Sequence, residues 1–164
     1  MTSLKKINSK IIANKEGLSS ILKAWTKENK RIVFTNGCFD ILHRGHIDYL
    51  AKASDYGDVL VIGLNTDDSV SRLKGPHRPI QDEKSRAHIM AALEFVDLVV
   101  YFNEDTPYDL IKIVQPDVLV KGADYKVEDI VGYDVVIAKG GKVETLDFLP
   151  GYSTSAIETK IKNS

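Results

Sequence analysis

The sequence predicts a single α/β domain, in which a doubly wound parallel sheet is covered by helices on both faces. Segments with strand and helix character alternate along nearly the whole chain, as they do in this class. The strand segments, such as DVLVIGL at 58–64, are continuously apolar, which is typical of strands buried on both faces. A length of 164 residues matches one domain with a substantial core.

The N-terminal 30 residues are expected to form a helical extension ahead of the main domain at 31–164. Leu18, Ile21, Leu22 and Trp25 recur at the spacing of one apolar helix face. Within the main domain, short apolar runs predict strands at 31–35, 58–64, 98–102, 116–121, 134–138 and 142–146. The last two strands are expected to flank a turn at 140–141.

Helices are expected between most of these strands, at 46–54, 67–73, 82–95, 106–114 and 153–162. Asn65-Thr66 is the capping candidate for the second of them. Asp105 or Thr106 would cap the fourth, with Pro107 in its first turn. Two prolines and a glycine predict a loop at 74–81. Ligands of such sheets bind at the carboxyl ends of the strands, so the loops after residues 35, 64, 102, 120 and 146 are the places to inspect.

Composition excludes several functional classes. The formal net charge of −1 offers no basic excess for nucleic acid or an anionic membrane surface. Cys38 is the single cysteine, so no intrachain disulfide can form. No apolar run approaches the roughly 18 residues that a membrane span needs, and no signal-peptide core follows the N-terminal lysines. We therefore expect a cytoplasmic protein.

The segment TNGCFDILHRGH at 35–46 occupies the position of a phosphate loop, between a strand and a helix start. It matches neither the dinucleotide fingerprint nor the P-loop. His43 and His46 are three residues apart, and Gly45 between them would let a bulky anion approach the backbone. Two histidines near a helix start could also ligate zinc, although no third ligand cluster accompanies them. From spacing alone, phosphate contact and metal ligation both stay open.

GCFDILHRGH at 37–46 resembles the H-x-G-H signature of the nucleotidyltransferase superfamily, whose members share a Rossmann-like fold. RLKGPHRPI at 72–80, EDTP at 104–107, VKGADY at 120–125 and GYSTSAI at 151–157 are similar to the heptose 1-phosphate adenylyltransferase family within it. This resemblance implies transfer of AMP from ATP, with Mg²⁺, to D-glycero-β-D-manno-heptose 1-phosphate. The products would be ADP-heptose for surface polysaccharide and pyrophosphate. It also implies a homo-oligomer and a separate sugar kinase that supplies the substrate.

The resemblance also implies roles for individual residues. His43, His46 and Lys74 would be catalytic through contacts with the triphosphate. Nucleotide-binding positions would be Asn36, Gly37, Cys38, Phe39, Gly45, Lys121, Gly122, Asp124, Tyr152, Ser153, Thr154 and Ser155. Acceptor-binding positions would be Asp40, Asn65, Asp67, Arg78 and Arg86. No carboxylate cluster predicts a metal site made by the protein.

Two other functions compete with this interpretation. A cytidylyltransferase acting on glycerol 3-phosphate or a similar alcohol phosphate would share the fold. Such enzymes place an arginine shortly before the S-T-S turn, where this chain has FLP at 148–150. A nucleotide-sensing protein without catalysis is the second alternative, and the intact histidine pair, Lys74 and the turn at 153–155 disfavour it.

Overall fold

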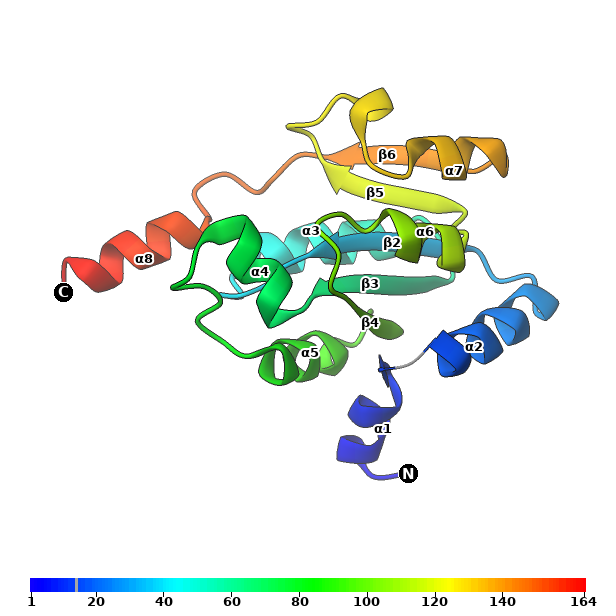
Figure 1. Ribbon diagram of the computed structural model, residues 1–164, viewed down its shortest axis with the longest axis horizontal. Coiled ribbons are helices and arrows are strands. Elements are labelled where there is room, and N and C mark those ends of the chain that lie inside the picture. The colour runs from blue at the N-terminus through cyan, green and yellow to red at the C-terminus, as the bar shows by residue number, and fades with distance from the viewer. Residues whose placement is uncertain (14) are drawn as a thin grey trace.

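The protein is built on a six-stranded parallel sheet with the order β1-β4-β3-β2-β5-β6 (Figure 1). The structure is a computed structural model that describes residues 1–13 and 15–164. The strands are β1 (Ile11–Ile12), β2 (Ile32–Gly37), β3 (Val59–Asn65), β4 (Leu98–Phe102), β5 (Val118–Gly122) and β6 (Lys142–Leu146). All seven residues of β3 are buried, as its unbroken apolar run predicts. The predicted fold class is confirmed.

Helices cover both faces of the sheet. One core layer joins the sheet to α2 (Lys15–Lys27), α6 (Tyr108–Val114) and α7 (Tyr133–Ala138). The other joins it to α1 (Ser3–Ser9), α3 (Arg44–Ser54) and α5 (Glu83–Ala92). Neighbouring strand residues such as Val33 and Phe34 belong to opposite layers, because successive side chains of a strand point to opposite faces.

Strand β1 is an element that the sequence did not predict. Ile11 and Ile12 pair with Val99 and Val100 at the open edge of β4. Two residues are too short to show any period, so no apolar pattern indicated a strand there. The N-terminal 30 residues, expected as a helical extension, therefore also contribute one strand to the main sheet.

The strand predicted at 134–138 is wrong, because this segment forms helix α7. β5 and β6 are parallel neighbours, and parallel strands need a crossover rather than a hairpin. The short 3₁₀ helix η1 (Val127–Asp129) and α7 form that crossover. Gly140, with φ of +83°, follows the end of α7 instead of turning a hairpin. The apolar β-branched residues of this segment suggested a strand. Because β6 runs parallel to β5, the segment between them has to cross over one face of the sheet, and it does so as a helix.

Two helices lie at the carboxyl end of the sheet, α4 (Asp67–Lys74) and α8 (Thr154–Lys162). Thr66 caps α4 as predicted, because its hydroxyl accepts the Ser69 N–H at 3.3 Å. The cap predicted for α6 is wrong, since Pro107 occupies the N-cap position and no side chain caps that helix. Across the described residues, no helix is both long and apolar enough to cross a membrane.

Candidate active site

A cavity of about 530 Å³ opens at the carboxyl ends of β2 and β5. Its walls come from these strand ends, the first turns of α3, the last residue of α4, and the segment that leads into α8. The lining residues are Asn36, Gly37, Cys38, Phe39, His43, Gly45, His46, Tyr49, Lys74, Lys121, Gly122, Asp124, Tyr125, Phe148, Tyr152, Ser153 and Thr154. The three residues predicted to be catalytic are therefore brought together, with all the predicted nucleotide-binding residues except Ser155.

The two histidines of the motif cap the helix that follows them. His43 is the N-cap of α3, and its Nδ1 accepts the Gly45 N–H at 3.1 Å. His46 stands in the first turn, and its Nδ1 accepts the His43 N–H at 3.3 Å. The rings stack with centroids 3.9 Å apart, and the edge of Phe39 lies against His46. Their spacing thus satisfies a capping box, with both rings in the cavity wall.

This capping fixes the tautomer of both rings. Because each Nδ1 accepts a backbone N–H, the proton of a neutral ring resides on Nε2. Burial lowers the pKa of His46 to about 4, helped by the nearby His43 and Lys74. Burial also lowers the pKa of His43. At neutral pH, the unliganded site therefore holds two neutral imidazoles, each with one N–H left to donate to a ligand.

The lowered pKa of His46 predicts a loss of stability in acid. The unfolded chain takes up a proton at the ordinary pKa of 6.5, whereas folded His46 resists protonation down to about 4. This contribution is complete above pH 6.5 and is lost as the pH falls towards 4. We expect the free energy of unfolding, measured with urea between pH 7 and 5, to decline more steeply in the wild type than in His46→Gln. Glutamine keeps the capping box but does not titrate, so equal slopes would contradict the prediction.

Two lysines supply positive charge to the cavity. Lys74 ends α4, and its ammonium group makes no ion pair or hydrogen bond with the described residues. Lys121 stands near the end of β5, with Nζ 5.9 Å from the centre of the Tyr125 ring. Burial lowers its pKa to about 8, although Asp124 and Cys38 oppose this shift. An anionic ligand would stabilise the charged form of Lys121 and give the unpaired Lys74 a partner.

The N-terminus of α8 completes the cavity wall. Ser153 is its N-cap, and the hydroxyl oxygen accepts the Ala156 N–H at 3.1 Å. Thr154 lies in the wall, whereas Ser155 is exposed and lies outside it. Free N–H groups and the partial positive charge of a helix N-terminus favour anions. The same turn thus caps the helix and offers donors to the cavity.

Two glycines in the wall are required by close packing. A Cβ atom on Gly122 would lie 2.2 Å from Cζ of Phe148, and one on Gly45 would lie 2.9 Å from Cε1 of His43. Any side chain at either position would displace an aromatic ring that forms the cavity. The motif glycine is therefore needed for the fit of the histidine itself, in addition to the access for an anion that the sequence suggested.

Asp40 and Arg78, both predicted to bind the acceptor, lie outside the cavity wall and contact each other. Asp40 is 3% exposed and accepts Nε of Arg78 at 2.7 Å, together with the N–H groups of Ile80 and Gln81. The hydrogen bonds and the ion pair hold the pKa of this carboxyl below its usual range, although burial opposes them. Asp40 therefore anchors the 75–81 loop. Nη2 of Arg78 is buried and has no hydrogen-bond partner among the described residues. This guanidinium therefore has one donor group that is not used within the protein.

Arg86 has a structural position that the resemblance did not indicate. It is completely buried, and Nε donates to the Gln81 carbonyl at 3.0 Å. Nη1 donates to the carbonyls of Cys38 and Asn65 at 2.7 and 2.8 Å, and Nη2 donates to Asp67 at 2.8 Å. These bonds tie the ends of β2 and β3 to α5. Arg86, Asn65 and Asp67 lie outside the wall of this cavity, and their contacts with the acceptor stay a prediction.

Three aromatic residues of the wall were missed by the sequence analysis. Tyr49 lies one turn after His46 on α3, and its hydroxyl bonds Thr35 at 2.9 Å and the Val120 carbonyl at 3.1 Å. The Tyr49 ring faces Phe148 at 6.0 Å between centroids. Tyr125 and Phe148 are both more than half exposed. The helical spacing of His46 and Tyr49 was a usable signal, and Tyr125 ends the VKGADY segment of the resemblance, whereas Phe148 carried none.

The side chains of the site suit neither a metal centre held by the protein nor catalysis by the Cys38 thiol. Among the described residues, no group of three or more His, Cys, Asp or Glu side chains could hold a metal, and Asp124 is the one acidic residue in the wall. A metal centre made by the protein does not fit, so we derive no step through one. Burial raises the pKa of the Cys38 thiol, which keeps it protonated and weakly nucleophilic.

Neutral imidazole donors, an unpaired lysine and a helix N-terminus converge where ligands of parallel sheets bind. Such a site on such a sheet suits the phosphates of a nucleotide, as the resemblance of the histidine motif to the nucleotidyltransferases predicts. The family model described as Cytidylyltransferase-like matches residues 34–160, and the chain belongs to this family.

Relatives and solved structures agree with this assignment. Proteins named "Bifunctional protein HldE" from Geobacter metallireducens and Geotalea uraniireducens are 57% and 56% identical, over 92% of this chain. The chain spans 31% of the length of each of these relatives. A lipopolysaccharide core biosynthesis protein from Thermoplasma volcanium is 32% identical, with a TM-score of 0.60 over 73% of this chain and 97% of its own. Pantoate-beta-alanine ligase from Francisella tularensis, 19% identical with a TM-score of 0.63, covers 93% of this chain and 76% of its own and shares the fold.

Proposed function

We propose that this chain transfers AMP from ATP to D-glycero-β-D-manno-heptose 1-phosphate, giving ADP-heptose and pyrophosphate. The observation that carries the reaction type is the pair of capping histidines, whose free Nε2–H groups share a cavity with the unpaired Lys74. The choice of sugar rests on the resemblance of the loop segments. The names of the HldE relatives and of the lipopolysaccharide core protein support a role in the same area of metabolism.

The proposed chemistry is a direct in-line displacement. A phosphate monoester is largely dianionic at pH 7, so its oxygen attacks the α-phosphorus without losing a proton. A new P–O bond forms, the bond between the α-phosphorus and the bridging oxygen breaks, and that electron pair leaves with pyrophosphate. His43, His46 and Lys74 stabilise the charge that grows on the departing oxygens. Mg²⁺ enters with ATP, bound mainly by phosphate oxygens.

The sugar phosphate would be supplied by a sugar kinase. The relatives are named bifunctional, and this chain spans 31% of their length. We assign the nucleotidyl transfer to the part of those proteins that this chain matches. In the proposed sequence of reactions, a kinase step therefore precedes the nucleotidyl transfer.

A test of the nucleotide and the acceptor together is the release of pyrophosphate by the purified protein. We expect release with Mg-ATP and D-glycero-β-D-manno-heptose 1-phosphate, and none with Mg-CTP and glycerol 3-phosphate. Testing each nucleotide with each acceptor shows whether a wrong prediction concerns the nucleotide or the acceptor. Turnover with CTP and glycerol 3-phosphate alone would favour the cytidylyltransferase alternative, whereas silence in every arm would contradict nucleotidyl transfer to these substrates.

A further inference from the structure

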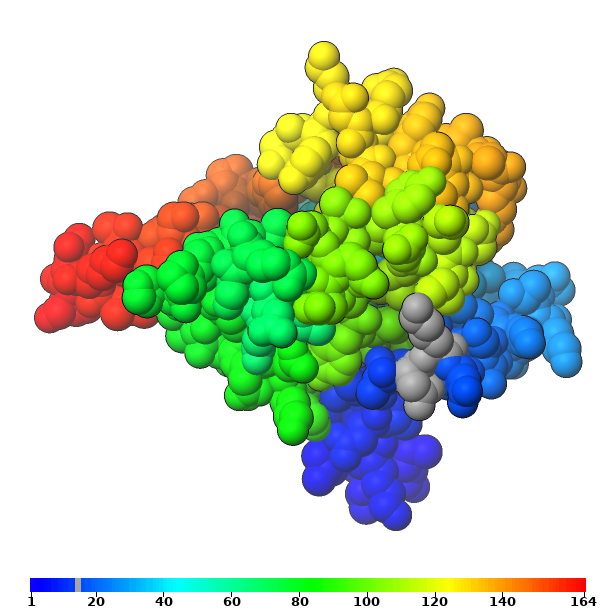
Figure 2. Space-filling model, viewed as in Figure 1, coloured from blue at the N-terminus to red at the C-terminus, as the bar shows by residue number. Residues whose placement is uncertain are grey.

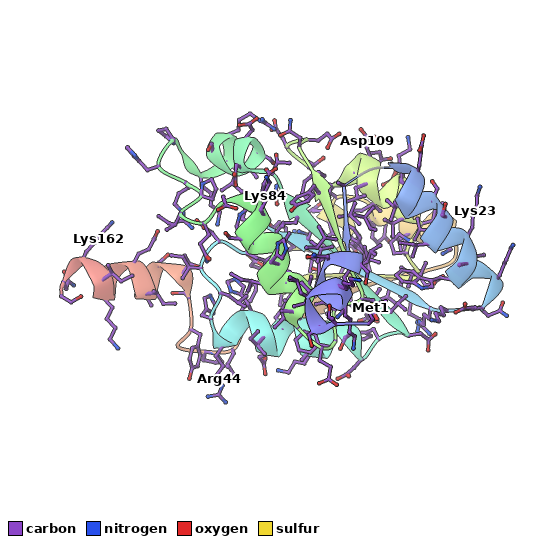
Figure 3. All side chains as sticks on the ribbon, turned by 90° about the horizontal axis from the view of Figure 1, so that it is seen from below. Met1, Lys23, Arg44, Lys84, Asp109 and Lys162 are labelled. Carbon is purple, nitrogen blue, oxygen red and sulfur yellow. The ribbon has the colours of Figure 1, made fainter. Side chains whose placement is uncertain are left out.

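Helix α8 projects from the body of the protein and buries none of its residues (Figures 1 and 2). In the view of Figure 3, Lys162 at its far end stands well away from the sheet. Thr154, Ile157 and Glu158 are its partly buried residues, and their spacing places them on one face of the helix. Helix α8 therefore has little of the apolar burial that normally fixes a helix in a domain, although its N-terminus forms part of the cavity wall.

One ion pair connects this face of α8 to the body. Oε1 of Glu158 accepts Nη1 of Arg78 at 2.6 Å, with the two side chains 32% and 15% exposed. Across the described residues, this is the one recorded hydrogen bond between α8 and a segment outside the helix and its cap. A nine-residue helix is too short to be stable alone, so its order depends on contacts of this kind.

The partner of Glu158 is itself firmly held. Arg78 also donates to Asp40, whose side chain is 1% exposed and follows the strand end at Gly37. The 75–81 loop that carries Arg78 begins directly after Lys74. The pair between Glu158 and Arg78 thus joins the N-terminus of α8 to the segments that present the other phosphate-facing groups.

We propose that Glu158 is a positioning residue, which holds the N-terminus of α8 against the nucleotide cavity through its ion pair with Arg78. This inference rests on the proposed function in one respect, that the cavity binds the phosphates of ATP. Glu158 itself lies outside the cavity wall and touches no reacting group. Its loss therefore weakens nucleotide binding through the helix, by moving the Ser153–Thr154 turn away.

Two measurements on the full chain test this proposal with the variants Glu158→Ala and Glu158→Gln. Hydrogen exchange without ligand reports the anchoring of α8. We expect amides of residues 157–162 to exchange about tenfold faster in Glu158→Ala, while those of β3 keep their wild-type rates. Calorimetric titration with Mg-ATP reports the consequence, and Kd is expected to rise about tenfold in Glu158→Ala and less in Glu158→Gln. In steady-state assays, the KM for ATP should rise more than kcat falls.

Lys160→Gln is the matched control, because it removes an exposed charge from the same helix and should change Kd less than twofold. Unchanged exchange in Glu158→Ala would overturn the anchoring. Faster exchange with an unchanged Kd would overturn the role in nucleotide binding. A wild-type chain that does not bind Mg-ATP would contradict the proposed function instead, and the exchange experiment would still decide whether Glu158 positions the helix.

Discussion

Replacing His43 with asparagine is expected to lower turnover by about 10²–10³-fold, the effect of removing one preorganised donor from developing negative charge. Asparagine is among the most favoured N-cap residues, and its side-chain oxygen can accept the Gly45 N–H as His43 Nδ1 does. The variant therefore removes the Nε2–H from the cavity and leaves the start of α3 capped. The measurement is kcat for pyrophosphate release, beside the urea unfolding midpoint.

His43→Asn separates an effect on the reaction from an effect on stability more clearly than His43→Ala does. Alanine at an N-cap costs about 0.5–2 kcal/mol of stability, so a loss of activity in that variant would have two explanations. His77→Asn is the matched control, because His77 is exposed and outside the cavity wall, and it should keep wild-type turnover. Normal turnover in His43→Asn would remove His43 from the catalytic assignment.

Replacing Arg86 with methionine is expected to reduce the free energy of unfolding by about 3–5 kcal/mol, because three carbonyl acceptors lose their donor at roughly 1–3 kcal/mol each. The side chain is completely buried and donates to three carbonyls and one carboxylate. Methionine fills much of the volume but cannot donate, so the buried acceptor at Asn65 and the partly buried acceptors at Cys38 and Gln81 lose their partner.

Urea denaturation checks this second prediction, with Lys84→Met as the control on the same helix. Lys84 is exposed, and its replacement should change stability by less than about 0.5 kcal/mol. The experiment also decides between two roles for Arg86. A variant of normal stability with a raised KM for the sugar phosphate would restore the acceptor-binding role that the resemblance implied.

Much of the sheet was predictable because its strands are buried on both faces. Burial on both sides leaves a continuous apolar run, which is visible without knowing the neighbours, as β3 illustrates. The histidine motif was predictable for a similar reason. Its residues are close in sequence and cap one helix, so their spacing already places them together.

The rest depended on contacts between distant segments, which spacing does not encode. Lys74 and Arg86 are both cations near the same loop, yet one is unpaired in the cavity and the other is saturated by carbonyl groups. Only the assembled fold determines which carbonyls surround a side chain. The same holds for Phe148, which reaches the cavity because Gly122 at the end of β5 leaves room for its ring.

Strand β1 protects the edge of the sheet. β4 has the sequence LVVYF, an apolar and β-rich segment of the kind that recruits other chains when its edge is free. Val99 and Val100 at the centre of that edge are paired with Ile11 and Ile12. The chain thus covers the edge of this apolar strand with two residues from its N-terminal region, and it does so on the side of the sheet farthest from β5 and the cavity.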